Sequence, residues 1–311
     1  MRVSKGEVIL RKRSEPHVRS SIALLPEAQL RPLLDAYAAS IRSRRWHTLL
    51  IFVCIAVAML LSSISAEVSP VRFFDNIHRF PSYILRLFHL ENGRPVWTDF
   101  GEWFWGLSRW LRLLGETLLM AYVGTLLGTV GAVFLCFLAA ANVAPSRWLR
   151  VAVRRFFELC RTVPELVYAL IFVIAFGLGP VAGVLAVIIH TMGALGKLFA
   201  EVVENIDMKP VEGITAAGSS WPVAMRFGAL PQTMSNFVSY ALLRFEINVR
   251  ATAVMGFVGA GGIGQDLIEA IRKFYYSDVS AILVMIVITV AVIDSLTSIV
   301  RHRLIGLEEK A

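Results

Sequence analysis

The sequence is poor in charged residues. Asp, Glu, Lys and Arg make up 17% of the 311 residues and hydrophobic residues 56%, whereas a soluble domain averages about 25% charged residues. A chain of this composition cannot cover itself with polar side chains, so most of its surroundings must be lipid. Its apolar runs reach the roughly 20 residues that a helix needs to cross a bilayer. The sequence therefore predicts an all-α, polytopic membrane protein.

Several kinds of chemical site have no support in the sequence. The three cysteines, of which none lies in a segment predicted to be outside, imply no disulfide framework and are expected to be buried apolar residues. The six histidines are dispersed and form no cluster with metal-ligand spacing. The G-x4-G-K-[ST] motif is absent, so the chain is not expected to bind ATP itself. We therefore expect no catalytic residue, metal or cofactor.

The positive charges indicate an orientation rather than a nucleic-acid partner. The net charge is +8, but the basic residues are scattered through short segments instead of lying on one soluble face. Residues 1–47 contain ten Lys or Arg against four acids, and such an excess marks the cytoplasmic side. We expect a cytoplasmic N-terminal extension over 1–47 and a transmembrane domain over 48–311.

Six transmembrane helices are predicted, which places both termini in the cytoplasm. A Trp-rich segment, 67–112, is expected outside against the lipid headgroups, and the basic segment 143–161 is expected to be an inner loop. Gly124 and Gly128 form a GxxxG pair that favours close helix packing. The predicted spans are 48–66, 114–142, 162–179, 180–195, 232–258 and 279–300.

The segment 201–231, which we call the coupling loop, differs from the other inner segments. It is acidic rather than basic, and prolines and Gly218 divide it into short pieces. We expect short helices joined at angles that project from the membrane and dock a cytoplasmic partner. The glycine cluster 259–264 follows the next span; it matches G-x-G-x-x-G without the strand context of a dinucleotide site, so a flexible outer turn is expected.

The predicted fifth span carries charge at membrane depth. Arg244, Glu246 and Arg250 lie inside it, and Asn248 shares a face with Arg244. Glu246 and Arg250 are four residues apart and can pair. Either these charges form ion pairs inside the bundle, with Glu116, Glu165 or Asp294 as partners, or Arg244, Glu246, Asn248 and Arg250 line a translocation path in which an arginine offsets the charge of an anion. His190, in the fourth span, is expected to be a hydrogen-bonded packing residue.

The coupling loop resembles that of the permeases of ABC importers. Their pattern is E-A-A, three residues, Gly, nine residues, I-x-L-P, and Glu212, Gly218, Leu230 and Pro231 fall at its positions. Gly213 and Ile214 replace the two alanines, and Gly228 replaces the isoleucine. The run from Glu212 through SYALLRFEINVRATAVMGFVGAGGIG resembles the phosphonate-type permeases of this superfamily.

The resemblance implies a type I ABC importer permease in the bacterial inner membrane. In such permeases the loop helix sits in a cleft of an ABC ATPase, two permease copies pair with two ATPases, and a periplasmic or lipoprotein phosphonate-binding protein delivers the solute. Phosphonate is the implied substrate, with phosphate and phosphite as alternatives. A membrane enzyme acting on a lipid phosphate and a passive channel are the other functions we consider. We expect membrane lipid but no nucleic acid as a further partner.

Overall fold

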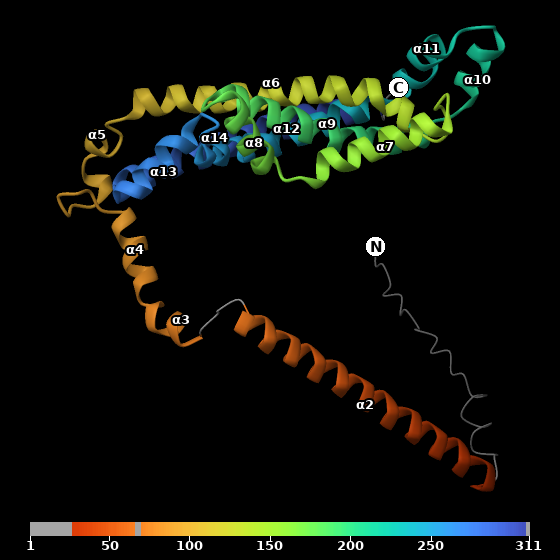
Figure 1. Cartoon of the computed structure of the whole chain (residues 1–311), viewed down its shortest axis with the longest axis horizontal. Coiled ribbons are helices and arrows are strands. Elements are labelled where there is room, and N and C mark those ends of the chain that lie inside the picture. The colour runs from red at the N-terminus through yellow and green to blue at the C-terminus, as the bar shows by residue number, and fades with distance from the viewer. Residues whose placement is uncertain (1–26, 66–69, 309–311) are drawn as a thin grey trace, which may run out of the picture. The chain divides into compact units, whose positions relative to one another are not determined.

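The computed structural model describes residues 27–65 and 70–308, and the chain divides into two units, 1–78 and 79–311. Within these described ranges the only β-type pairing is an isolated bridge between His89 and Pro95, and regular structure is otherwise helical (Figure 1). The predicted all-α membrane fold is confirmed.

The first unit contains a long helix, α2 (Glu27–Ser65), and a short one, α3 (Pro70–Asn76). Residues 44–63 of α2 are apolar enough to cross a membrane, and within the unit they are not buried by protein. This window covers most of the predicted first span, 48–66. Because α2 begins at Glu27, the basic residues Arg31, Arg42, Arg44 and Arg45 belong to the same helix as the span itself. Cys54 lies exposed on α2 and is not covered by other residues of this unit, which differs from the expected burial.

The second unit is a helical bundle. The helices α6, α9, α12 and α14 form its length, α10 and α11 project beyond one end, and α5 and α13 lie at the other (Figure 1). Its helices are α4 (Arg79–Leu87), α5 (Phe100–Trp103), α6 (Leu107–Ala139), α7 (Arg147–Thr162), α8 (Glu165–Phe176), α9 (Pro180–Glu204), α10 (Lys209–Ala216), α11 (Trp221–Ala224), α12 (Leu230–Met255), α13 (Ile263–Lys273) and α14 (Tyr276–Glu308).

Four described helices are long and apolar enough to span a membrane, and the number rises to six if each of two bent helix pairs counts as one span. The first pair, α7 and α8, is bent by 87°, and the second, from residue 221 to 273, by 50°. Most of the segment 143–161, which was predicted to be a loop, is the helix α7. Its Val153, Phe157 and Cys160 are buried at helical spacing, and its arginines are exposed or partly exposed.

The predicted boundaries of two other spans also need correction. The second span is helical from Leu107, not from residue 114, because α6 continues through Trp110, which is 3% exposed. The fourth does not stop at residue 195, because α9 continues to Glu204. Residues 201–204, the first part of the coupling loop, thus lie on a membrane helix.

Helices α6 and α9 form the closest pair in the bundle. A methyl group added to Gly124 would lie 2.5 Å from Val187, and one added to Gly128 would lie 2.9 Å from the carbonyl oxygen of Ile188. Only glycine allows the two helices to approach this closely, so the packing role predicted for the GxxxG pair is confirmed.

The tryptophans of the segment 67–112 contact the protein more than predicted. The indole of Trp103 donates a 2.9 Å hydrogen bond to Ser280, and that of Trp105 donates one of 2.9 Å to Asp278. Both partners lie at the start of α14. These tryptophans therefore tie the segment to the bundle, while Trp97, 60% exposed, remains available to a headgroup layer.

Candidate functional site: the coupling loop and an intramembrane charge cluster

The coupling loop is a chain of short helical pieces. Pro210 starts α10, Pro222 starts α11, and a π-helical turn, Met225–Ala229, leads into α12. Between α10 and α11 the chain turns at Gly218, whose φ of +84° is a left-handed conformation that favours glycine. The prediction of short helices joined at angles holds for α10, which ends at this turn, whereas α11 continues without a break through the π-helical turn into α12.

The projecting part of the loop exposes both charged and apolar groups. Glu212 lies exposed in the first turn of α10, where a carboxylate is favoured by the helix dipole. Phe227 is 62% exposed and Val223 is 40% exposed, although both are large apolar residues. A surface of this kind, polar at one point and apolar nearby, is typical of a protein interface.

Side-chain hydrogen bonds hold the loop on the bundle. The indole of Trp221 donates to the carbonyl of Val143 at 2.7 Å. The amide of Gln232 donates to the carbonyls of Gly228 at 2.7 Å and Asp207 at 3.1 Å, and its oxygen accepts from the backbone of Asp207. These bonds join the loop to the α6–α7 connection and to α12, so the loop and the bundle are mechanically continuous.

Leu230 and Pro231 occupy a different place from Glu212 and Gly218. Leu230 packs against the apolar core that includes Phe199 and Phe237, and Pro231 lies in the first turn of α12. The structure therefore divides the four motif residues into two exposed positions on the loop and two positions at the start of α12.

Arg244 lies between three helices. Its side chain is 13% exposed, and Nη2 lies 3.3 Å from Oε2 of Glu165 in the first turn of α8. The same carboxylate oxygen lies 3.5 Å from Nε2 of His190 on α9. Nδ1 of His190 lies 3.1 Å from the carbonyl oxygen of Val163, which agrees with the hydrogen-bonded role expected for this histidine.

Arg250 forms a second charged group one and a half turns further along α12. It pairs with Glu246, as the four-residue spacing predicts, and Nη2 lies 3.7 Å from Asp294 of α14. The Arg250 side chain is 51% exposed. Of the partners considered from the sequence, Glu165 and Asp294 are thus the ones that the structure brings to the two arginines.

Asn248 lies in the packing between helices. It is 1% exposed, and its amide nitrogen donates to Thr125 of α6 at 2.7 Å and to Thr191 of α9 at 2.8 Å. Its side chain therefore faces the neighbouring helices α6 and α9. Since both amide hydrogens are used, it connects α12 to the closely packed α6–α9 pair.

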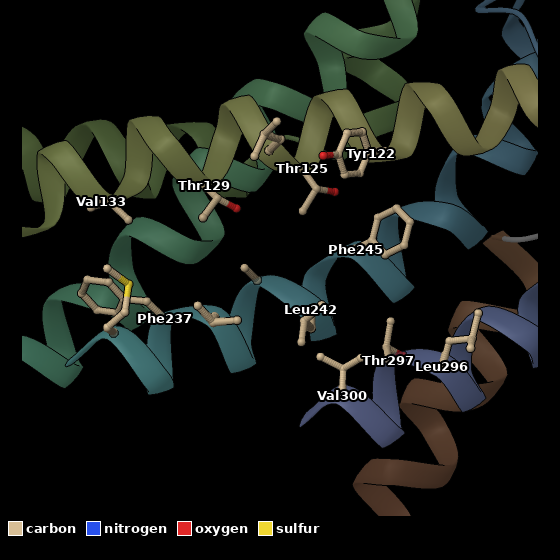
Figure 2. Close-up of a pocket in the computed structure, with 14 residues that line it drawn as sticks. Tyr122, Thr125, Thr129, Val133, Phe237, Leu242, Phe245, Leu296, Thr297 and Val300 are labelled. Atoms are coloured by element: carbon tan, nitrogen blue, oxygen red, sulfur yellow. The ribbon is translucent and has the colours of Figure 1, made fainter. Parts of the chain in front are cut away.

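An apolar groove of about 390 Å³ runs between α6, α12 and α14. Figure 2 shows Tyr122 and Thr125 on its α6 side, Phe245 and Leu242 on its α12 side, and Val300 on its α14 side. Its polar groups are hydroxyls alone, and no charged side chain lines it. The groove is suited to apolar groups. The charged groups around Arg244 and Arg250, not this groove, have the chemistry to hold an anion.

The glycine cluster is packed rather than loose. The backbone N–H of Gly179 donates to the carbonyl of Gly259 at 3.0 Å, and a methyl group on Gly264 would lie 2.3 Å from the carbonyl oxygen of Ala253. The turn leads into α13, an amphipathic helix that we did not predict. The predicted turn is confirmed, and these contacts pack it against the neighbouring helices; its outer position stays a prediction.

No group of three or more potential metal ligands occurs among the residues that the structure describes. The described charged groups of the bundle interior instead form ion pairs. Sequence spacing predicted the pair within α12, but the approach of Glu165 to Arg244 depends on the bend between α7 and α8.

Comparison with known proteins agrees with this architecture. A transport permease for phosphite of Stutzerimonas stutzeri, PtxC, is 40% identical over 198 residues, covering 64% of this chain and 72% of that protein. A putative cryptic phosphonate permease of Escherichia coli K12, PhnE2, is 48% identical over 121 residues, 39% of this chain and 99% of that protein. A phosphate-import permease of Mycolicibacterium smegmatis, PhnE, is 37% identical over 190 residues, 61% of this chain and 36% of that protein.

Solved structures share the fold at low identity. The MetNI methionine ABC transporter, in an inward-facing form, matches with a TM-score of 0.55 at 22% identity over 63% of this chain and 95% of that one. A bacterial ABC transporter involved in the import of alginate matches with a TM-score of 0.57 at 14% identity over 80% of this chain and 95% of that one. The family model for the inner membrane component of binding-protein-dependent transport systems matches residues 132–305, and this chain belongs to that family.

Proposed function

We propose that this membrane permease imports a phosphorus oxyanion, a phosphonate or alternatively phosphite or phosphate, using energy from a separate ATPase subunit. Arg244 carries the proposal, because a guanidinium at membrane depth fits an oxyanion with its planar fork. The phosphite, phosphonate and phosphate relatives support this substrate class. Membership of a transport family decides against the alternative of a lipid-phosphate enzyme.

The coupling loop transmits the work of the ATPase. Glu212 and Gly218 lie on its exposed part and meet the ATPase, whereas Leu230 and Pro231 begin α12 and receive the displacement. The hydrogen bonds of Gln232 on both sides of the π-helical turn support this division, since they link the loop to the first turn of α12. A push on α10 therefore reaches the helix that carries Arg244.

The translocation path passes the polar residues of α12. Arg244 and Arg250 offset the charge of the anion, and Glu246 pairs with Arg250 on the same helix. Asn248 stabilises the packing of α12 against α6 and α9 through its two hydrogen bonds. The half-exposed side chain of Arg250 supports its access to the path.

The working assembly contains two copies of this permease, two ATPase subunits and an external solute-binding protein, in the periplasm or anchored as a lipoprotein. Both termini lie in the cytoplasm, because that orientation places residues 1–47 and the basic arginines of α7 inside. A symmetric pair of permeases encloses one central path.

Uptake into proteoliposomes tests this function. The permease, its ATPase and its binding protein are reconstituted, and uptake of radiolabelled phosphite, phosphate and methylphosphonate is measured with and without ATP. We expect ATP-dependent uptake of at least one of them, greatly reduced in R244Q and in R250Q although the ATPase stays bound. ATP-independent uptake would instead identify a passive channel, and uptake of none of the three would contradict the proposed substrate class.

The docking role of Glu212 has its own comparison. E212A should reduce copurification of the ATPase and uptake together. E158A, which removes a partly exposed carboxylate that pairs with Arg155 on α7, should change neither. Equal ATPase recovery with E212A and E158A would contradict the docking role.

A further inference from the structure

The guanidinium of Arg244 is only partly satisfied in the structure. Its contact with Glu165 is 3.3 Å through one nitrogen, whereas strong arginine–carboxylate pairs are bidentate at about 2.7–2.9 Å. Nε of Arg244 is buried and has no hydrogen-bond partner among the described residues. The existing contact thus neutralises the arginine and leaves part of its donor fork free.

Glu165 has stabilising neighbours besides Arg244. It lies in the first turn of α8, where the helix dipole favours a carboxylate. Nε2 of His190 lies 3.5 Å from the same oxygen that faces Arg244. Nδ1 of His190 donates to the Val163 carbonyl, and this hydrogen bond holds the ring with Nε2 toward Glu165. Loss of Arg244 would therefore not leave Glu165 as an isolated buried charge.

We propose that Glu165 is the resting counter-ion of Arg244 and that the transported oxyanion takes its place. The proposal rests on the function proposed above. An arginine at membrane depth is costly without an anion beside it. Glu165 supplies that anion when the path is empty, and a tetrahedral oxyanion displaces it by bonding two nitrogens of the fork instead of one. Glu165 then stays with the α8 amino end and His190.

Arg250 does not have the geometry for this exchange. Its partner Glu246 lies on the same helix, Asp294 is a second carboxylate 3.7 Å away, and the side chain is half exposed. An anion arriving there meets two carboxylates and a solvated arginine. Arg244 has one carboxylate and a buried free donor, so the exchange is specific to it.

The test measures anion binding apart from transport. The purified permease–ATPase complex, without binding protein, is heated at increasing phosphite concentration, and the concentration giving half of the maximal rise in melting temperature is recorded. E165Q removes the competing charge but keeps the size of the side chain. We expect its half-maximal concentration to fall roughly threefold to tenfold, as expected for the loss of a competitor worth about 1 kcal/mol. R244Q and the double variant E165Q/R244Q should show no phosphite-dependent rise.

Two further variants make the result decisive. E165D keeps the charge but withdraws it from Arg244, so its half-maximal phosphite concentration should lie between those of the wild type and E165Q. If E165Q fails to fold, the comparison of E165D with the wild type still tests the exchange. D266N removes the carboxylate that pairs with Arg109 at 2.7 Å between α13 and α6 and should leave the value unchanged.

The outcomes separate the exchange from the proposed function. Equal half-maximal concentrations for the wild type, E165D and E165Q, with uptake of phosphite intact, would overturn the exchange alone. Recovery of normal uptake in E165Q/R244Q would show a purely structural ion pair and overturn it as well. Absence of any uptake of the three phosphorus oxyanions by the wild type would contradict the proposed substrate instead.

Discussion

The indole nitrogen of Trp221 donates a 2.7 Å hydrogen bond to the carbonyl oxygen of Val143, a residue 78 positions earlier in the chain. Val143 lies in the connection between α6 and α7. The bond therefore fastens the middle of the coupling loop to the two helices that flank this connection. Through it, displacement of α11 acts on α6 and α7 as well as on α12.

Replacing Trp221 by Phe should weaken coupling while keeping the ring in place. The substitution removes one hydrogen bond, worth about 1 kcal/mol. We expect fewer oxyanions transported per ATP hydrolysed, with ATPase binding retained. The ratio of uptake to ATP hydrolysis in proteoliposomes measures this. W148F, at a tryptophan that is 84% exposed on α7, is the control, and an equal ratio in both variants would speak against the anchor.

Replacing Gly218 by Ala should loosen the coupling loop through backbone strain alone. Gly218 has φ +84°, but nothing lies within 4 Å of an added methyl group. A left-handed conformation costs a non-glycine residue about 1–2 kcal/mol. We expect weaker copurification of the ATPase. Gly213, also without neighbours but inside α10, is the matched control, since G213A should favour the helix. If G218A binds the ATPase as well as G213A does, the turn has no role in docking.

Replacing Asn248 by Ala should destabilise the bundle more than it affects the chemistry of the path. The change removes two interhelical hydrogen bonds, each worth about 0.6 kcal/mol inside a membrane. We expect a lower melting temperature in detergent and nearly normal uptake per folded molecule. N236A, at an exposed position of the same helix, should leave the melting temperature unchanged. Loss of uptake at an unchanged melting temperature would mean that Asn248 contacts the anion directly.

Much of the fold could be predicted because hydropathy and local pattern decide it. Apolar runs located the main helices, and the spacing of Gly124 and Gly128 indicated their close packing. Helix α7 was missed because its arginines suggested an inner loop. The signal was nevertheless present, since Val153, Phe157 and Cys160 recur at helical spacing.

The partner of Arg244 could not be decided from the sequence. Glu116, Glu165 and Asp294 were equally acceptable, because their distances from Arg244 depend on how α6, α8 and α14 pack against α12. The 87° bend between α7 and α8 brings Glu165 to Arg244, and no local pattern specifies that angle. In the same way, the burial of Asn248 follows from threonines on two other helices, whereas its own spacing only placed it on the face of Arg244.

The hydrogen bond between Gly179 and Gly259 limits how this permease can move. It clips the α8–α9 hairpin to the end of α12, and Leu178 fills the space beside Gly259, where an added methyl group would lie 2.2 Å from it. We therefore expect α8, α9 and the end of α12 to move together as one rigid unit. A rearrangement that opens this permease is then expected to displace α8, α9 and the end of α12 together, and not to separate them from one another.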